Sequence, residues 1–119
     1  MTTAARSRDL MRHLGYLSEV VEHRQGRFLR KDLFDLGDTL AIKPGAIILI
    51  QAYRSGATKQ HAHLNGSHPT VRAWLRAGGR FQHHRWFARK AGWMCRRLEV
   101  TETAITPYPD VNSRGKEMA

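Results

Sequence analysis

With 119 residues, of which 41% are hydrophobic, the chain can build one packed core but not two, and no apolar run reaches the roughly 18 residues that a membrane span requires. A single cysteine excludes an internal disulfide and a cysteine-rich zinc site, and no apolar segment follows the basic N-terminus, so we expect a cytoplasmic protein without a secretory signal, in the host cytoplasm if the chain is viral. The formal net charge of +10 exceeds what solubility requires and indicates a polyanionic partner.

The N-terminal third predicts one helix followed by strands. In residues 4–14 apolar side chains recur three and four positions apart, which is typical of an amphipathic helix, and Gly15 is placed to end it. Residues 16–24 favour a strand because they are rich in β-compatible side chains, although their middle is also compatible with more helix. We expect a turn at residues 25–27, followed by residues 28–33.

The central stretch predicts a β-hairpin that carries polar side chains at its strand ends. Residues 39–42 and 46–50 have strand composition, and Pro44 and Gly45 between them are suited to a tight turn. The second strand is so apolar that we expect both of its faces to be buried. Its polar neighbours are three acids just before the first strand and an amide just after the second: Asp32, Asp35, Asp38 and Gln51.

Residues 55–69 predict a polar loop with three histidines, His61, His63 and His68. Such a spacing is compatible with a zinc-type site, but no Cys, Asp or Glu in the loop completes the ligand set. We therefore favour an exposed loop that contacts phosphates over a metal site.

The second half predicts a helix and a second hairpin. Residues 70–77 form the helix, with a buried stripe of Val71, Trp74 and Leu75 and two glycines that end it. Strands follow at residues 80–87 and 93–101, joined by a basic turn at residues 88–92. Two tryptophans flank this turn, and we expect them to pack across it, with stacking on bases as the alternative: Trp86 and Trp93.

The composition changes at residue 104 to Pro, Asp, Asn, Ser, Gly and Lys without apolar periodicity. We therefore expect one domain over residues 1–103 and a flexible tail over residues 104–119.

Positive charge is concentrated in the second half of the chain. No Asp or Glu occurs from Thr39 to Leu98. A solvated surface normally mixes both signs, so this stretch favours nucleic-acid binding over an ordinary solvent-exposed face. No basic amphipathic helix with a broad apolar face points to a membrane surface. The expected DNA contacts are the basic residues Arg54, Lys59, Arg72, Arg76, Arg80, Arg85, Arg89 and Lys90.

The hairpin and its acids resemble a known family. The phrase Asp32-Leu33-Phe34, Gly37-Asp38, Leu49 and Gln51 resembles the PD-(D/E)XK nucleases, in particular the small phage-type and VRR-NUC proteins related to archaeal-type Holliday junction resolvases. The resemblance continues weakly through Trp74 to Trp86 and covers roughly residues 15–98.

This resemblance implies a restriction-endonuclease-like α/β fold with an αβββαβ core, in which helices flank a mixed central sheet. It implies a metal-dependent DNA endonuclease that uses Mg²⁺ or Mn²⁺, with Asp38 and Gln51 as metal ligands and Glu22 as a possible third. Branched DNA is one possible substrate, and no residue in the sequence indicates the structure of the DNA that is cut. Because a resolvase makes two symmetric cuts, a homodimer is also expected, with residues 93–101 as the exposed edge strand, unless these residues pack inside the monomer.

The chain departs from the family pattern at the second strand, where the family has Glu-x-Lys. Gln51 stands at the Glu position and Tyr53 at the Lys position. Gln replaces the Glu in parts of the superfamily, but a tyrosine cannot supply the positive charge. Either Lys43, Lys59 or Arg54 takes over this role, or the chain is a non-catalytic DNA-binding protein that retains the nuclease fold.

Overall fold

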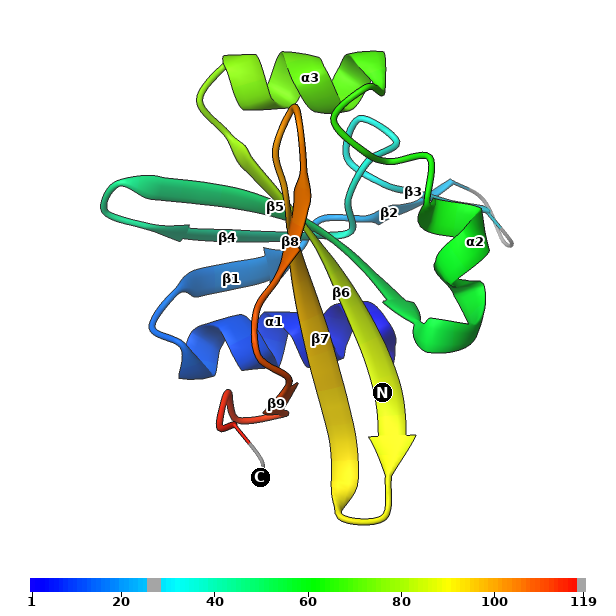
Figure 1. Cartoon of the computed structure of the whole chain (residues 1–119), viewed down its shortest axis with the longest axis vertical. Coiled ribbons are helices and arrows are strands. Elements are labelled where there is room, and N and C mark those ends of the chain that lie inside the picture. Colours follow the sequence, from blue (N-terminus) through cyan, green and yellow to red (C-terminus); the bar gives the residue numbers. More distant parts are fainter. Residues whose placement is uncertain (26–28, 118–119) are drawn as a thin grey trace.

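The computed structural model describes residues 1–25 and 29–117, so most of the turn expected at residues 25–27, and Phe28 after it, lie outside the described residues (Figure 1). The described chain forms a mixed sheet flanked by helices, as expected for the α/β class. Its strands lie in the order β1 (Leu17–Val20), β4 (Thr39–Lys43), β5 (Ala46–Arg54), β6 (Arg80–Arg89), β7 (Gly92–Val100) and β8 (Ile105–Pro107), with β9 (Val111–Asn112) also paired with β7.

Neighbouring strands in this sheet are antiparallel except β5 and β6, which are parallel. A parallel pair needs a crossover connection. Here the crossover consists of a 3₁₀ turn η1 (Ser55–Ala57), a short helix α2 (Thr58–His61) and helix α3 (Pro69–Arg76). The polar loop expected at residues 55–69 is therefore partly helical.

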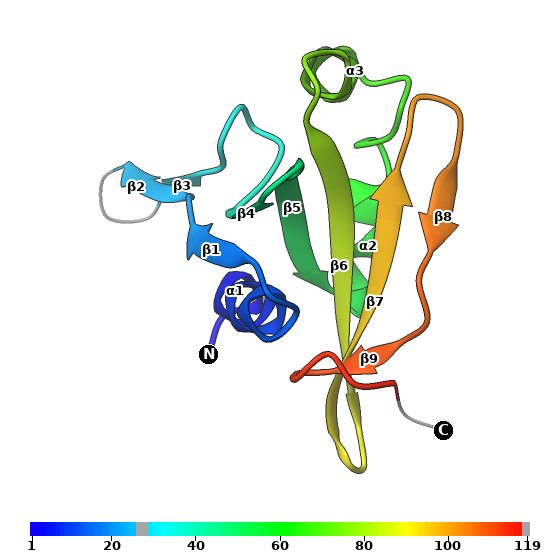
Figure 2. The same cartoon turned by 90° about the vertical axis from the view of Figure 1, so that its left-hand side faces the viewer.

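The sheet separates two apolar layers, because successive side chains of a strand point to opposite faces. On one face, Ile48 and Ile50 of β5 pack with Met11 of helix α1 (Thr3–His13). On the other face, Leu49 packs with Phe81 of β6 and with the α3 side. Helix α1 contacts β1, β4 and β5, and Figure 2 shows it end-on beside β1, whereas α3 lies near the start of β6.

The predicted N-terminal helix is confirmed to within one residue at either end. Thr2 caps it by accepting a hydrogen bond from the backbone N–H of Ala5, and Leu10 is fully buried. The strand expected at residues 16–24 is divided into β1 and β2 (His23–Gln25), because the N–H groups of Val21 and Glu22 turn to the carbonyl of Asp38. Strand β2 then pairs with β3 (Leu29–Lys31) in a separate hairpin.

The central hairpin is confirmed, with Gly45 at a φ of 81° in its turn. Two details differ from the expectation. Strand β5 continues through Gln51 to Arg54, since β6 supplies pairing partners along that part. The buried apolar run holds for the middle of β5 but not for Ile47, which is 39% exposed.

The segment from residue 104 packs on the sheet, contrary to the flexible tail that its composition indicated. β8 pairs with β7 through residues Leu98–Val100, and β9 pairs with Met94 and Cys95. Val111 is only 2% exposed because it fills a pocket beside Trp86 and Cys95. Strand β7 is thus no exposed edge, and the homodimer prediction loses the surface on which it rested.

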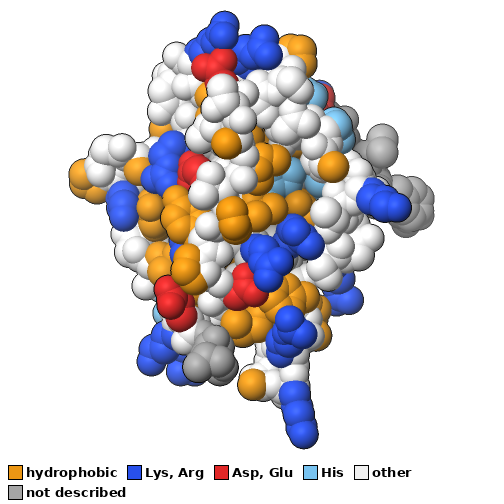
Figure 3. All heavy atoms as spheres, in the orientation of Figure 1, with side chains coloured by type: hydrophobic (Ala, Val, Ile, Leu, Met, Phe, Trp, Pro, Cys, Tyr) orange, Lys and Arg blue, Asp and Glu red, His pale blue; other side chains and the backbone are white. Residues whose placement is uncertain are grey.

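None of the helices in the described part of the chain is long and apolar enough to cross a membrane. In the space-filling view, Lys and Arg side chains lie both at the α3 end of the molecule and at the end formed by the β6–β7 hairpin (Figure 3).

Candidate active site

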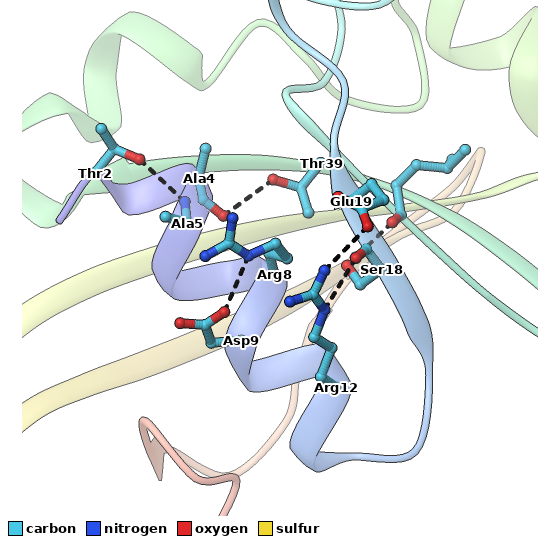
Figure 4. Close-up of polar contacts among 10 residues, drawn as sticks. Thr2, Ala4, Ala5, Arg8, Asp9, Arg12, Ser18, Glu19 and Thr39 are labelled. Atoms are coloured by element: carbon cyan, nitrogen blue, oxygen red, sulfur yellow. Dashed lines mark hydrogen bonds and ion pairs between the residues drawn. The ribbon is translucent and has the colours of Figure 1, made fainter.

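Asp38 lies at the entry to β4, where its carboxylate completes the hydrogen bonding of β5. Its Oδ2 accepts a hydrogen bond of 3.1 Å from the N–H of Ala52, and its Oδ1 accepts one of 2.8 Å from the hydroxyl of Thr39. Thr39 also contacts the carbonyl oxygen of Ala4 at the start of α1 (Figure 4). Ala52 has no partner residue on β4, and the Asp38 carboxylate accepts its N–H instead. Hydrogen bonds from Ala52 and Thr39 therefore fix the position of this carboxylate.

The carboxyl group of Asp38 is buried near other acids. Burial, more than any other cause, raises its pKa to about 7; the hydrogen bonds from Thr39 and Ala52 act in the opposite direction, and the charges of Asp32 and Glu22 raise it further. Glu22 itself forms an ion pair of 3.2 Å with Arg30. The carboxylates of Asp38, Asp32 and Glu22 therefore come from different segments of the chain but lie close enough for the latter two to raise the pKa of Asp38.

Gln51 connects one of these acids to the crossover helices. It is 7% exposed and points to the same face of β5 as Leu49. In the amide orientation that satisfies its neighbours, its nitrogen donates to Asp32 Oδ2 at 3.0 Å and to the carbonyl of Leu36 at 3.3 Å, and its oxygen accepts from His61 Nδ1 at 3.1 Å. Burial and Glu22 raise the pKa of Asp32, whereas the hydrogen bond from Gln51 lowers it.

Tyr53 occupies the position at which the family pattern has lysine, and its surroundings keep it neutral. Its hydroxyl lies 2.7 Å from His83 Nδ1, while His83 Nε2 lies 2.7 Å from the carbonyl oxygen of Leu64. Because a carbonyl only accepts, His83 Nε2 carries the proton and Nδ1 accepts from Tyr53. Burial raises the pKa of Tyr53 to about 12 and lowers the pKa of His83. His61 stacks on the Tyr53 ring at 4.3 Å.

Two of the three cations expected to replace the lysine, Lys43 and Arg54, lie away from Asp38. Lys43 lies at the far end of β4, about 16 Å away by strand rise, with its Nζ 4.3 Å from the ring centre of Tyr16. Lys59 is exposed on α2, two positions before His61. Arg54 points to the opposite face of β5 from Gln51, since three positions separate them.

The loop histidines serve different purposes. His61 contacts Gln51, as described above, whereas His68 caps α3 by accepting a hydrogen bond from the N–H of Thr70. His63 and His68 lie with ring centres 5.8 Å apart. Within residues 1–25 and 29–117, no three His, Cys, Asp or Glu side chains are already arranged to hold one metal ion.

Several of the arginines expected to contact DNA have carboxylate partners from residues beyond 98. Arg72 and Arg76 both contact Glu102, at 3.7 and 2.9 Å. Arg80 pairs with Glu99 at 2.8 Å. Other expected contacts have no carboxylate within ion-pair distance among the described residues: Arg54, Lys59, Arg85, Arg89 and Lys90.

The two tryptophans of the second hairpin differ in exposure. Trp86 is fully buried, and its indole N–H donates to Ser7 Oγ at 2.9 Å, so it cannot stack on a base. Trp93 borders the same core cluster but is partly exposed. In the register, Trp86 pairs with Cys95 and Trp93 with Ala88, so the two do not face each other directly across the turn.

The contacts that join Asp32, Gln51 and His61, and the one that joins Tyr53 and His83, were not predicted from the sequence. Strand alternation does place Gln51 and Tyr53 on one face. The register of a parallel pair, which brings His83 beside Gln51, has no signal in the local sequence.

The chain matches no protein-family model, no curated protein and no solved structure.

Proposed function

We propose that this chain is a metal-dependent DNA endonuclease of the PD-(D/E)XK type. The observation that carries the proposal is the position of Asp38 at the entry to β4, next to the β5 position of Gln51, where burial and then the charges of Asp32 and Glu22 raise its pKa. The succession α1, β1, β4, β5, helical crossover and parallel β6 also supports an αβββαβ core, into which the β2–β3 hairpin is inserted.

The donor atoms are suited to Mg²⁺ or Mn²⁺, which prefer carboxylate and amide oxygens. A carboxyl group whose pKa is raised by burial, and further by two neighbouring acids, is also a group that a divalent cation would stabilise in its charged form. Asp38 and Asp32 would hold the ion, with Glu22 and the oxygen of Gln51 as further ligands. The ion would activate water and stabilise charge on the phosphate. Because no three acids or histidines of the described chain are already grouped around one point, loading requires side-chain rearrangement.

The protein's own residues position this site. Thr39 and Ala52 hold the Asp38 carboxylate, and Gln51 holds Asp32 against the α2 side. Cations without carboxylate partners, Arg85 and Arg54 among them, would bind flanking phosphates.

A second candidate is a DNA-binding protein without nuclease activity. One observation favours it: the lysine position holds a neutral tyrosine engaged with His83, and two of the replacement cations, Lys43 and Arg54, contact aromatic rings elsewhere. Both candidates bind DNA, and they differ in whether a phosphodiester bond is broken.

The deciding experiment incubates purified protein with linear and branched DNA in the presence of Mn²⁺. We expect cleavage by the parent protein and none by Asp38→Asn, which removes an anionic ligand but retains DNA affinity. Asp35→Asn is the matched control, since it removes the same charge from an exposed side chain three positions away. Binding without cleavage by the parent would establish the second candidate, and cleavage by Asp38→Asn at the parental rate would remove Asp38 from the site.

A further inference from the structure

The β6–β7 hairpin projects beyond the rest of the sheet. The last pair between β5 and β6 is Arg54 with Trp86, after which β6 continues to Arg89. On the other side, the pairing of β9 begins only at Met94. In the described chain, residues 87–93 therefore form a two-stranded ribbon without a third strand, and it extends roughly 10 Å past the end of β5. Figures 1 and 2 show this ribbon at the end of the molecule opposite α3.

The tip of the ribbon carries exposed positive charge. Arg89 and Lys90 are both exposed, and within the described residues neither has a carboxylate at ion-pair distance. The Arg89 guanidinium lies 4.9 Å from the ring centre of Phe87. Asp110, whose pKa is lowered mainly by its hydrogen bond with Arg96 and to a lesser extent by the charge of Arg89, is already paired with Arg96 at 2.8 Å. The tip is therefore a net cation.

Both faces of the ribbon's base also carry cations. On the α1 face, the guanidinium groups of Arg6 and Arg54 lie 4.3 and 5.0 Å from the ring centre of Trp93. On the opposite face, Arg85 lines a shallow hollow with Phe87, Arg89 and Arg96. The buried Nε of Arg85 has no hydrogen-bond partner in the described structure. A ribbon that is cationic at its tip and on both faces matches a groove with a phosphate backbone on either wall.

We propose that the β6–β7 hairpin enters the major groove of duplex DNA. The major groove is wide enough for a two-stranded ribbon, whereas the minor groove is about half as wide. Arg89 and Lys90 at the tip each reach a phosphate that borders the groove, and the cations on the two faces contact its walls nearer the base of the ribbon: Arg6 and Arg54 on one side and Arg85 on the other. This inference takes DNA as the partner from the proposed function, but it requires no cleavage.

The ribbon also determines where DNA lies relative to Asp38. Gln51 pairs with His83 in the register, and Arg89 follows six residues later along β6, which is about 20 Å. A duplex bound by the hairpin thus contacts the protein at the end of the sheet where β5 and β6 finish, and its contact with Arg89 lies about 20 Å along β6 from the level of Gln51.

The test compares two double variants that remove the same charge. Arg89→Ala/Lys90→Ala changes the ribbon, and Arg72→Ala/Arg76→Ala changes α3 at the other end of the molecule. With DNA at the hairpin, Arg72 and Arg76, which both pair with Glu102, lie outside the DNA interface and are withdrawn from the expected DNA contacts. Affinity for a short duplex is measured by fluorescence anisotropy in EDTA between roughly 50 and 200 mM salt, a range in which phosphate contacts dominate the salt dependence. Thermal unfolding of each variant establishes that it is folded.

We expect the ribbon variant to lower the slope of log affinity against log salt by about 2, because each lost phosphate contact removes about 0.9. At 0.1 M salt the loss of these two phosphate contacts weakens the binding of the ribbon variant to DNA on the order of 60-fold. We expect the α3 variant to keep the parental slope. Equal slopes for the parent and the ribbon variant would overturn the proposal. So would displacement of the protein from DNA by netropsin, a minor-groove ligand, but not by methyl green, a major-groove ligand.

These outcomes are separate from those of the nuclease test. Loss of affinity in the ribbon variant, together with no cleavage by the parent in Mn²⁺, would support the hairpin and reject the nuclease. Cleavage by the parent, together with an unchanged salt slope in the ribbon variant, would support the nuclease and reject the hairpin proposal.

Discussion

Replacing Asp38 by Asn should stabilise the protein at neutral and alkaline pH while removing the proposed cleavage of DNA. The substitution preserves the local hydrogen bonds, since the amide oxygen of Asn can accept from Ala52 and its nitrogen can donate to the Thr39 hydroxyl, which already contacts the carbonyl of Ala4. What it removes is a buried carboxyl group surrounded by other acids.

The magnitude follows from the pKa of about 7 in the folded protein, against an ordinary value of 3.8. Three pKa units correspond to about 4 kcal/mol, which is an upper limit for the gain in the free energy of unfolding. Below about pH 4 both states are protonated and the group has no effect. Between about pH 4 and 7 the unfolded chain ionises first, so folding loses about 1.4 kcal/mol per pH unit, and above pH 7 the loss is constant.

The assay is urea unfolding of the parent and Asp38→Asn across this range. The difference between the two free energies of unfolding should be near zero at about pH 4 and reach up to about 4 kcal/mol at pH 8, in favour of the variant. Buried His84, with its pKa lowered to about 3, titrates in the same range in both proteins, so the difference cancels its effect. A difference that does not change with pH, or a variant that is less stable at pH 8, would refute the raised pKa of Asp38 in the folded protein.

Two further predictions concern packing. Val111→Ala should lower the free energy of unfolding by about 2 kcal/mol, because it removes buried methyl groups. It should also speed the reaction of buried Cys95 with a thiol reagent. An unchanged reaction rate would mean that β9 does not protect this thiol. Gly37→Ala should destabilise by roughly 1 to 3 kcal/mol and reduce cleavage, since its Cβ would lie 2.5 Å from Leu49 Cγ, whereas Gly56→Ala, with open space around it, should leave the thermal midpoint unchanged.

The parts of the fold that local patterns encode were predicted well. Helix α1, the β4–β5 hairpin, helix α3 and the β6–β7 hairpin each follow from short-range periodicity and turn residues. Residues 104–117 were not recognised as part of the sheet, because their strands are short and are stabilised by pairing with β7 rather than by an apolar pattern of their own. The division of residues 16–24 depends on the carbonyl of Asp38, which is likewise a distant partner.

The candidate site could be predicted only where it lies within one hairpin. The relation of Asp38 to Gln51 follows from the turn at Gly45 and the antiparallel register. The contacts of Gln51 with Asp32 and His61 depend on how the β3–β4 connection and α2 fold over the strand, and no spacing rule gives them. The arginine partners come from residues 99–110, outside the acid-free stretch, so the sequence overstated the free positive charge.

The parallel pair in the middle of the sheet has a consequence for how the nascent chain folds. Strand β5 pairs at once with β4 through a short turn, but its other edge is paired only by β6, which follows after residues 55–79. Until β6 leaves the ribosome, that edge is open along an apolar stretch with no charged side chain between Ala46 and Tyr53. Open apolar edges pair readily with other chains. Translation that pauses before residue 80 is therefore expected to favour aggregation, and chaperone binding during that interval is expected to favour native folding.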